Sequence, residues 1–277
     1  MLSYSALDFE LAGNPIYQRL SRAVPVNTLR QWLIAAVIAA PVYGMFIAGW
    51  LIQADIVYAT VTLFSALAAI ACAVLPVTLA VMTASMTYQD TRGENYEFIR
   101  LTPLSGAQIM EGYYHAAFRR FAALRRIGIA LTPASLVGFI VLNLIFDRAP
   151  RQILGAPAPA LELEDYLFIF LMLAVLATLC ALLIAVTTQF NKLGIEAGIG
   201  VAIRLRRQSY PLIALVAALP VAAIALVAAT ASVILIASQG YLWLWPCLPV
   251  YMIGLLLPLA GRKIIRNRFI ASIDRAR

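Results

Sequence analysis

The chain has 277 residues, of which 63% are hydrophobic and 12% are charged, and its mean hydropathy is +0.88. Soluble domains are usually about 45–50% apolar, so this composition argues against an ordinary soluble fold. The charged residues occur in blocks separated by apolar stretches of about 20 or more residues, which is typical of bilayer-spanning helices. We therefore predict an all-α, polytopic membrane helical bundle.

The apolar runs predict about six transmembrane helices. They cover 31–52, 56–84, 127–146, 166–190, 211–238 and 241–260. About 20 helical residues cross a hydrocarbon core of ~30 Å, so the longer runs must tilt or project into water. Pro246 and Pro249 leave open a re-entrant segment within 211–260. Because the spans leave no long polar stretch, we expect one transmembrane domain, 1–277.

The distribution of lysine and arginine predicts that both termini are cytoplasmic, because basic residues near span ends are retained on that side. Every basic residue except Arg148 and Arg151 then lies on the inner side. The inner segments are an amphipathic N-terminal segment, 1–30, a long first loop, 85–126, a short loop after the fourth span, and a basic tail, 261–277. The net charge of +8 is divided among these segments. We therefore expect contacts with anionic membrane lipids and not with nucleic acid.

The sequence offers no candidate catalytic residues. No ionisable side chain lies in the central part of an expected span, where proton relays need one. No G-x-x-x-x-G-K-[ST] loop occurs, so we expect no ATP site and no enzyme activity in this chain. The single histidine, His115, lies outside the spans, and the three cysteines all lie in apolar runs, so we expect no metal or cofactor. Gly194 and Gly198 match G-x-x-x-G, which we interpret as a loop or helix end on the inner side.

The loop 85–126 contains a candidate surface helix. Gly93 followed by Glu94 predicts a turn, and Pro103 ends the helix because the residue before a proline avoids the helical region.

Glu97, Phe98 and Leu101 would lie about one turn apart in this helix. Such a short helix suits docking into a groove on a soluble partner. The residues leave open a solvated loop or one that lies on the lipid surface.

This region resembles the first cytoplasmic loop of type-2 ATP-binding-cassette exporter permeases, which carries roughly E-x-G-T-x-E-x-L-x-x-T-P-L-S and then I-x-x-G-K. The matching residues are Gly93, Glu97, Thr102, Pro103, Leu104, Ser105, Ile109 and Gly112. Asn14, Pro15 and Ile16 are similar to the N-P-[IV] start of the connecting helix that precedes the first span in that family. Tyr113 stands where a lysine is common.

The resemblance implies the permease subunit of an exporter in a prokaryotic plasma membrane. Its partners would be a second permease chain, identical or related, and a cytoplasmic ATPase subunit that holds ATP and magnesium. The implied ATPase-coupling residues are Glu94, Glu97, Phe98, Arg100, Leu101, Thr102, Pro103 and Leu104. The substrate is left open. An alternative of another class is a non-transporting anchor or scaffold subunit of a larger respiratory or photosynthetic membrane complex.

Overall fold

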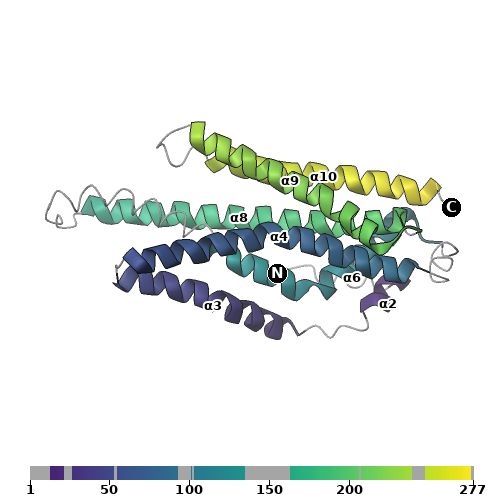
Figure 1. Ribbon diagram of the computed structural model, residues 1–277, viewed down its shortest axis with the longest axis horizontal. Coiled ribbons are helices and arrows are strands. Elements are labelled where there is room, and N and C mark those ends of the chain that lie inside the picture. Colours follow the sequence, from purple (N-terminus) through teal and green to yellow (C-terminus); the bar gives the residue numbers. More distant parts are fainter. Residues whose placement is uncertain are drawn as a thin grey trace. The chain divides into compact units, whose positions relative to one another are not determined.

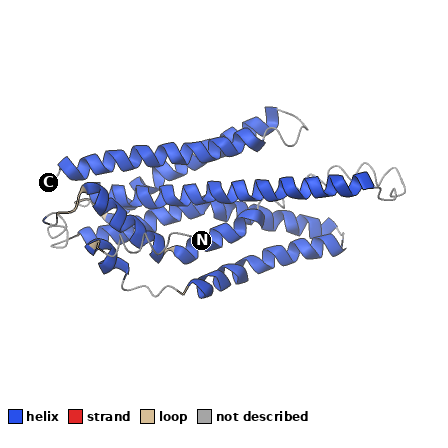
Figure 2. Ribbon diagram, turned by 180° about the vertical axis from the view of Figure 1, so that it is seen from behind, coloured by secondary structure: helices blue, strands red, loops and turns tan. Residues whose placement is uncertain are grey.

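The computed structural model describes residues 13–21, 27–52, 55–92, 101, 103–134, 163–205, 207–238 and 247–275. All regular secondary structure in these ranges is helical (Figure 2), which confirms the predicted all-α class. The named helices are α2 (Pro15–Ser21), α3 (Thr28–Ile52), α4 (Asp55–Thr91), α6 (Gly106–Arg120), α8 (Leu163–Arg204), α9 (Tyr210–Ser238) and α10 (Cys247–Arg275) (Figure 1). Residues 122–134 form a further helical stretch.

The long helices overlap the apolar runs, but three of them continue past the expected span ends. α4 runs on to Thr91, α8 to Arg204 and α10 to Arg275. In the expected inner loop 85–126, residues 85–91 instead continue α4. The helices at 106–120 and 122–126 agree with the helical spacing of apolar residues in 108–126, which predicts an amphipathic helix leading into the third span. The change from apolar to polar residues ends an apolar run without ending the helix, because no glycine or proline breaks the backbone hydrogen bonds of α4 there.

One helical stretch within the described part of the chain is long and apolar enough to cross a membrane. It covers Leu67–Thr91, with 25 residues and a mean hydropathy of 2.3, and a shorter apolar stretch covers Tyr210–Ala225. The topology with about six spans stays a prediction.

The chain divides into two compact units. The first comprises Met1–Gln31, Ala73–Arg125 and Thr188–Arg277, and the second comprises Trp32–Cys72 and Arg126–Thr187. In the second unit, Ala39, Val42, Ala68, Leu131 and Ala134 form an apolar core. The hydroxyl of Tyr43 donates a hydrogen bond of 2.8 Å to the carbonyl oxygen of Ala130 beside that core.

The core of the first unit joins residues of α2, α4, α6 and α8. Its buried members are Ile16, Leu75, Leu79, Met86, Ile109, Met110, Tyr113, Ala117, Phe121, Ile195, Ile199 and Ile203. Because four helices contribute to one apolar cluster, burial of these side chains fixes the helices to one another.

Two glycines allow α8 to approach α4 closely. A Cβ atom on Gly194 would overlap the carbonyl oxygen of Pro76, and one on Gly198 would overlap the carbonyl oxygen of Ala80. Both glycines lie within α8 and not in a loop or at its end, so that expectation was wrong. The motif acts here as in membrane helix pairs, where small residues let two backbones meet.

Candidate functional site

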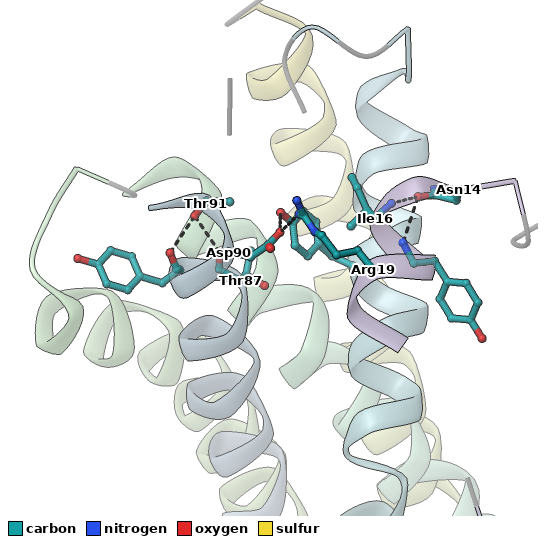
Figure 3. Close-up of polar contacts among 9 residues, drawn as sticks. Asn14, Ile16, Arg19, Thr87, Asp90 and Thr91 are labelled. Carbon is teal, nitrogen blue, oxygen red and sulfur yellow. Dashed lines mark hydrogen bonds and ion pairs between the residues drawn. The ribbon is translucent and has the colours of Figure 1, made fainter. Parts of the chain in front are cut away.

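The N-terminal motif begins helix α2 through the side chain of Asn14. Its Oδ1 atom accepts hydrogen bonds from the backbone N–H groups of Ile16, at 3.1 Å, and Tyr17, at 3.3 Å (Figure 3). Pro15 occupies the first helical position, where its missing N–H costs nothing. The Asn14–Pro15–Ile16 motif therefore supplies the cap and the first turn of α2.

The same asparagine joins α2 to α6. Its Nδ2 atom donates a hydrogen bond of 2.8 Å to the carbonyl oxygen of Gln108. A Cβ atom on Gly112 would lie 2.6 Å from Asn14 Oδ1, so only glycine leaves room for the carboxamide. Asn14 and Gly112 come from the two separate segments that carry the family resemblance, and the structure brings them into direct contact.

Helix α6 begins with a capping box. The N–H of Gln108 donates to Ser105 Oγ at 3.3 Å, and Gln108 Oε1 accepts from the N–H of Ser105 at 2.8 Å. The serine of the T-P-L-S motif is thus the residue that starts α6. The spacing S-x-x-Q is a known helix-start signal that could have revealed this from sequence.

Asp90 joins the end of α4 to both α2 and α6. Its Oδ2 atom lies 2.5 Å from Arg19 Nη2 and accepts a hydrogen bond of 2.6 Å from the hydroxyl of the buried Tyr113 (Figure 3). A carboxylate in the last turn of a helix opposes the helix dipole, so these two donors offset an unfavourable position. Tyr113, noted as a departure from the family's lysine, contributes one of them.

At the end of α4, a side chain of the same helix also bonds to the last carbonyl groups. The Thr91 hydroxyl donates to the carbonyl oxygen of Thr87 at 2.8 Å and lies 3.3 Å from that of Tyr88. These bonds satisfy carbonyl groups that lack partners at a helix end. The guanidinium of Arg92 lies 5.7 Å from the centre of the Tyr88 ring.

Three of the predicted coupling residues are described. Leu101 is 82% exposed, Pro103 is also exposed, and Leu104 packs against the core of the first unit. The other predicted coupling residues, Glu94, Glu97, Phe98, Arg100 and Thr102, lie outside the described residues. In the described part of the motif, Leu101 therefore faces outward, and Leu104 packs inward and anchors the segment.

A second polar cluster links α8 to α10. Arg262 on α10 donates from Nη2 to Glu196 Oε1 at 2.7 Å and from Nη1 to Gln189 Oε1 at 2.9 Å. Glu196 is 3% exposed, so its charge depends on this arginine. Burial acts to lower the pKa of Arg262, but the hydrogen bond and charge of Glu196 outweigh it and raise that pKa. The sequence assigned Glu196 to a loop or helix end and gave no sign of this partner.

Lys192 lies beside this pair. Burial lowers the pKa of its ammonium group from the ordinary value, and the positive charges of Arg262 and Arg125 lower it further, while Glu196 opposes them. Across the described residues, no hydrogen-bond acceptor or ion-pair partner is found for the Lys192 ammonium group.

Helix α6 is also tied to α10, through an ion pair of 2.6 Å between Glu111 and Arg266. It therefore contacts α2 through Asn14, the end of α4 through Tyr113 and Asp90, and α10 through Glu111.

Among the described residues, no group of three or more His, Cys, Asp and Glu side chains could hold a metal ion.

No protein-family model matches the chain, and comparisons with curated proteins and with solved structures give no significant match.

Proposed function

We propose that this chain is the transmembrane permease subunit of an ATP-binding-cassette transporter of the exporter class. In this proposal about six helices span the prokaryotic plasma membrane with both termini inside. A second permease chain completes the pathway, and a separate cytoplasmic subunit binds and hydrolyses ATP.

The surface of the helices supports a lipid environment. Only 39% of the most apolar window in Leu67–Thr91 is buried, whereas the core helix of a soluble protein would be mostly buried. On α9, Leu212, Leu215 and Leu219 are 41%, 57% and 57% exposed and share one face of the helix. Such a row of large apolar side chains is costly in water and favourable against lipid tails.

Prolines in the interior of four helices also support a lipid environment. Pro41, Pro76, Pro220 and Pro258 lie inside α3, α4, α9 and α10. A proline within a helix of a soluble protein costs ~3 kcal/mol, whereas membrane helices carry proline more often. Four long apolar helices with an internal proline each therefore favour a membrane bundle.

The observation that carries the transporter assignment is the contact between Asn14 and Gly112. It brings the N-terminal motif and the loop motif into direct contact, joining α2 to α6. The exposed Leu101 precedes this assembly in the chain, and Leu104 anchors the intervening turn to its core. A partner that binds Leu101 would thus move α6 together with the helices that contact α6.

In the proposed mechanism, these contacts pass movement from the partner to the helices. ATP binding closes a pair of ATPase subunits, and the docked segment at 94–104 passes that movement to α6. The Tyr113–Asp90 and Glu111–Arg266 contacts carry it on to α4 and α10. The permease then changes between two arrangements whose balance is biased by the nucleotide on the partner.

The test is purification of the full chain from native membranes together with its partners. We expect a co-purifying chain that has a phosphate-loop ATPase motif. Phe98→Asp with Leu101→Asp is expected to uncouple ATP hydrolysis from the permease while membrane insertion stays intact. Ile264→Asp is the matched control, because Ile264 is 56% exposed and lies in the expected inner tail. ATPase activity that is equally stimulated in the double variant and in the control contradicts the proposal, and a partner set without any ATPase favours the scaffold alternative.

A further inference from the structure

Two ion pairs tie α10 to its neighbours, and they differ in their access to water. Arg266 bonds to Glu111 of α6 at 2.6 Å, and Arg262, one turn earlier on α10, bonds to Glu196 of α8 at 2.7 Å. The side chain of Glu111 is 46% exposed, whereas that of Glu196 is 4% exposed. Water can therefore solvate Glu111 when its pair opens, but the buried charge of Glu196 needs a partner from the protein.

Arg262 engages one of the two carboxylate oxygens of Glu196. Oε1 accepts the hydrogen bond from Arg262 Nη2, while Oε2 is buried and has no hydrogen-bond partner among the described residues. A buried carboxylate oxygen without a donor is unfavourable. Glu196 therefore keeps an unused acceptor for a second cation.

Lys192 is the cation that the helix places one turn from that acceptor. It lies four residues before Glu196 in α8, so the two side chains share one face of the helix. Lys192 is partly buried, and its ammonium group has no hydrogen bond or ion pair in the described part of the chain. The positive charge of Arg262 opposes that of Lys192 in the present arrangement. Departure of Arg262 would both free Glu196 and remove this repulsion.

We propose that Glu196 exchanges its partner, from Arg262 on α10 to Lys192 on its own helix, when α10 moves away from α8. In the present arrangement Arg262 joins the two helices. In the other arrangement Lys192 neutralises the carboxylate within α8, so the helices separate without leaving a buried charge unpaired. The ion pair is thus a switch between two arrangements and not a fixed link. This inference requires no ATPase partner, so it can fail or hold independently of the proposed transport function.

The first measurement compares unfolding temperatures of the purified full chain in detergent. Lys192→Met is expected to leave the unfolding temperature unchanged or to raise it while Arg262 holds Glu196, because a partly buried, repelled cation is removed. In the Arg262→Met background the same substitution is expected to lower it by about 4 °C or more, because Glu196 then loses its last partner. Adding Glu196→Gln should abolish this second effect. Lys263→Met is the matched control, because it removes an exposed lysine of α10 and should act equally in both backgrounds.

The second measurement is the distance between α8 and α10 in nanodiscs, which needs no double variant at the ion pair. Spin labels are placed at the exposed positions 204 on α8 and 264 on α10, in a chain whose three native cysteines are replaced. Arg262→Met is expected to enrich the longer distances relative to the wild type, whereas Lys192→Met is not.

The exchange is supported by a Lys192→Met effect that changes sign between the two backgrounds and disappears with Glu196→Gln. An effect of the same sign and size in both backgrounds overturns it, as do equal distance distributions in Arg262→Met and Lys192→Met. If the doubly substituted chain fails to fold, the distance distributions of the two single variants decide.

Discussion

The carboxamide of Asn14 lies directly on the backbone of Gly112, where an added Cβ atom would be 2.6 Å from Oδ1 and 2.9 Å from Nδ2. Both residues belong to the motifs on which the family resemblance depends. Their contact explains why each position carries its residue type. The asparagine caps α2 and bonds to α6, and the glycine leaves space for the asparagine side chain.

Gly112→Ala is expected to destabilise the protein. The new methyl group must displace the Asn14 side chain, which loses its bond to Gln108, and overpacking of this kind costs about 1–3 kcal/mol. The midpoint of thermal unfolding measures the loss. Gly44→Ala is the control, because nothing lies within 4 Å of a Cβ atom there. Equal effects of the two substitutions would argue against the contact.

Substitutions at Asn14 separate its two roles. Asn14→Ala removes both the cap of α2 and the link to α6, and we expect a loss of about 1–2 kcal/mol. Asn14→Asp keeps an acceptor for the N–H groups of Ile16 and Tyr17 but cannot donate to Gln108. Its stability, measured by chemical unfolding, is expected to lie between those of the wild type and Asn14→Ala. If the aspartate variant is as stable as the wild type, the bond to Gln108 contributes nothing.

The glycine contacts between α8 and α4 predict a non-additive effect. Gly194→Ala and Gly198→Ala each force α8 away from a backbone carbonyl of α4, at a cost of about 1–3 kcal/mol. Once the helices have separated for one methyl group, the second should cost less. The double variant is therefore expected to be more stable than the sum of the single losses indicates. Full additivity in thermal unfolding would mean that the two sites act separately.

The ion pair between Arg262 on α10 and Glu196 on α8 predicts that removing one partner destabilises the protein more than removing both. Arg262→Met leaves the charge of the buried Glu196 without this partner, and we expect a loss of about 3 kcal/mol. Adding Glu196→Met removes that charge and should restore part of the stability. A double variant less stable than Arg262→Met, compared by thermal unfolding, would contradict this account of the pair.

Lys192 predicts a pH effect of definite sign. Its pKa is lowered in the folded state by burial and by Arg262 and Arg125, against the opposing charge of Glu196. Between the folded and unfolded pKa values the unfolded chain binds more protons, so this lysine's contribution to stability rises with pH. Its cost is fully present below the folded pKa and is gone above the unfolded value.

In phosphate-free buffer, Lys192→Gln should therefore be more stable than the wild type at neutral pH. The advantage should shrink as the pH rises toward the ordinary lysine value of 10.5. The measurement is the difference in unfolding free energy between the two proteins across this range, in which other titrating groups cancel. An advantage that grows with pH has the wrong sign for this explanation.

The sequence predicted the helices better than their ends and contacts. The apolar runs indicated α3, α4, α8, α9 and α10. A helix that is apolar over its whole length, whether its surface is buried or exposed, has few polar residues and therefore appears in the sequence as one apolar run. The ends of α4, α8 and α10 were placed too early, because those helices continue as polar segments.

Contacts between distant residues could not be predicted from local pattern. Nothing in the sequence near Asn14 points to Gly112, and nothing near Glu196 points to Arg262, since each pair depends on how separate helices meet. The capping box of Ser105 and Gln108 is different. It is a local signal and was open to prediction.

The most direct test of the central claim places a photoreactive amino acid at position 101 and illuminates cells that express the full chain. The account predicts a cross-link from this exposed position to a cytosolic chain with a phosphate-loop ATPase motif, identified by mass spectrometry, and none to that chain from position 264. Cross-links from position 101 to lipid alone, or to a protein on the outer side of the membrane, would contradict it.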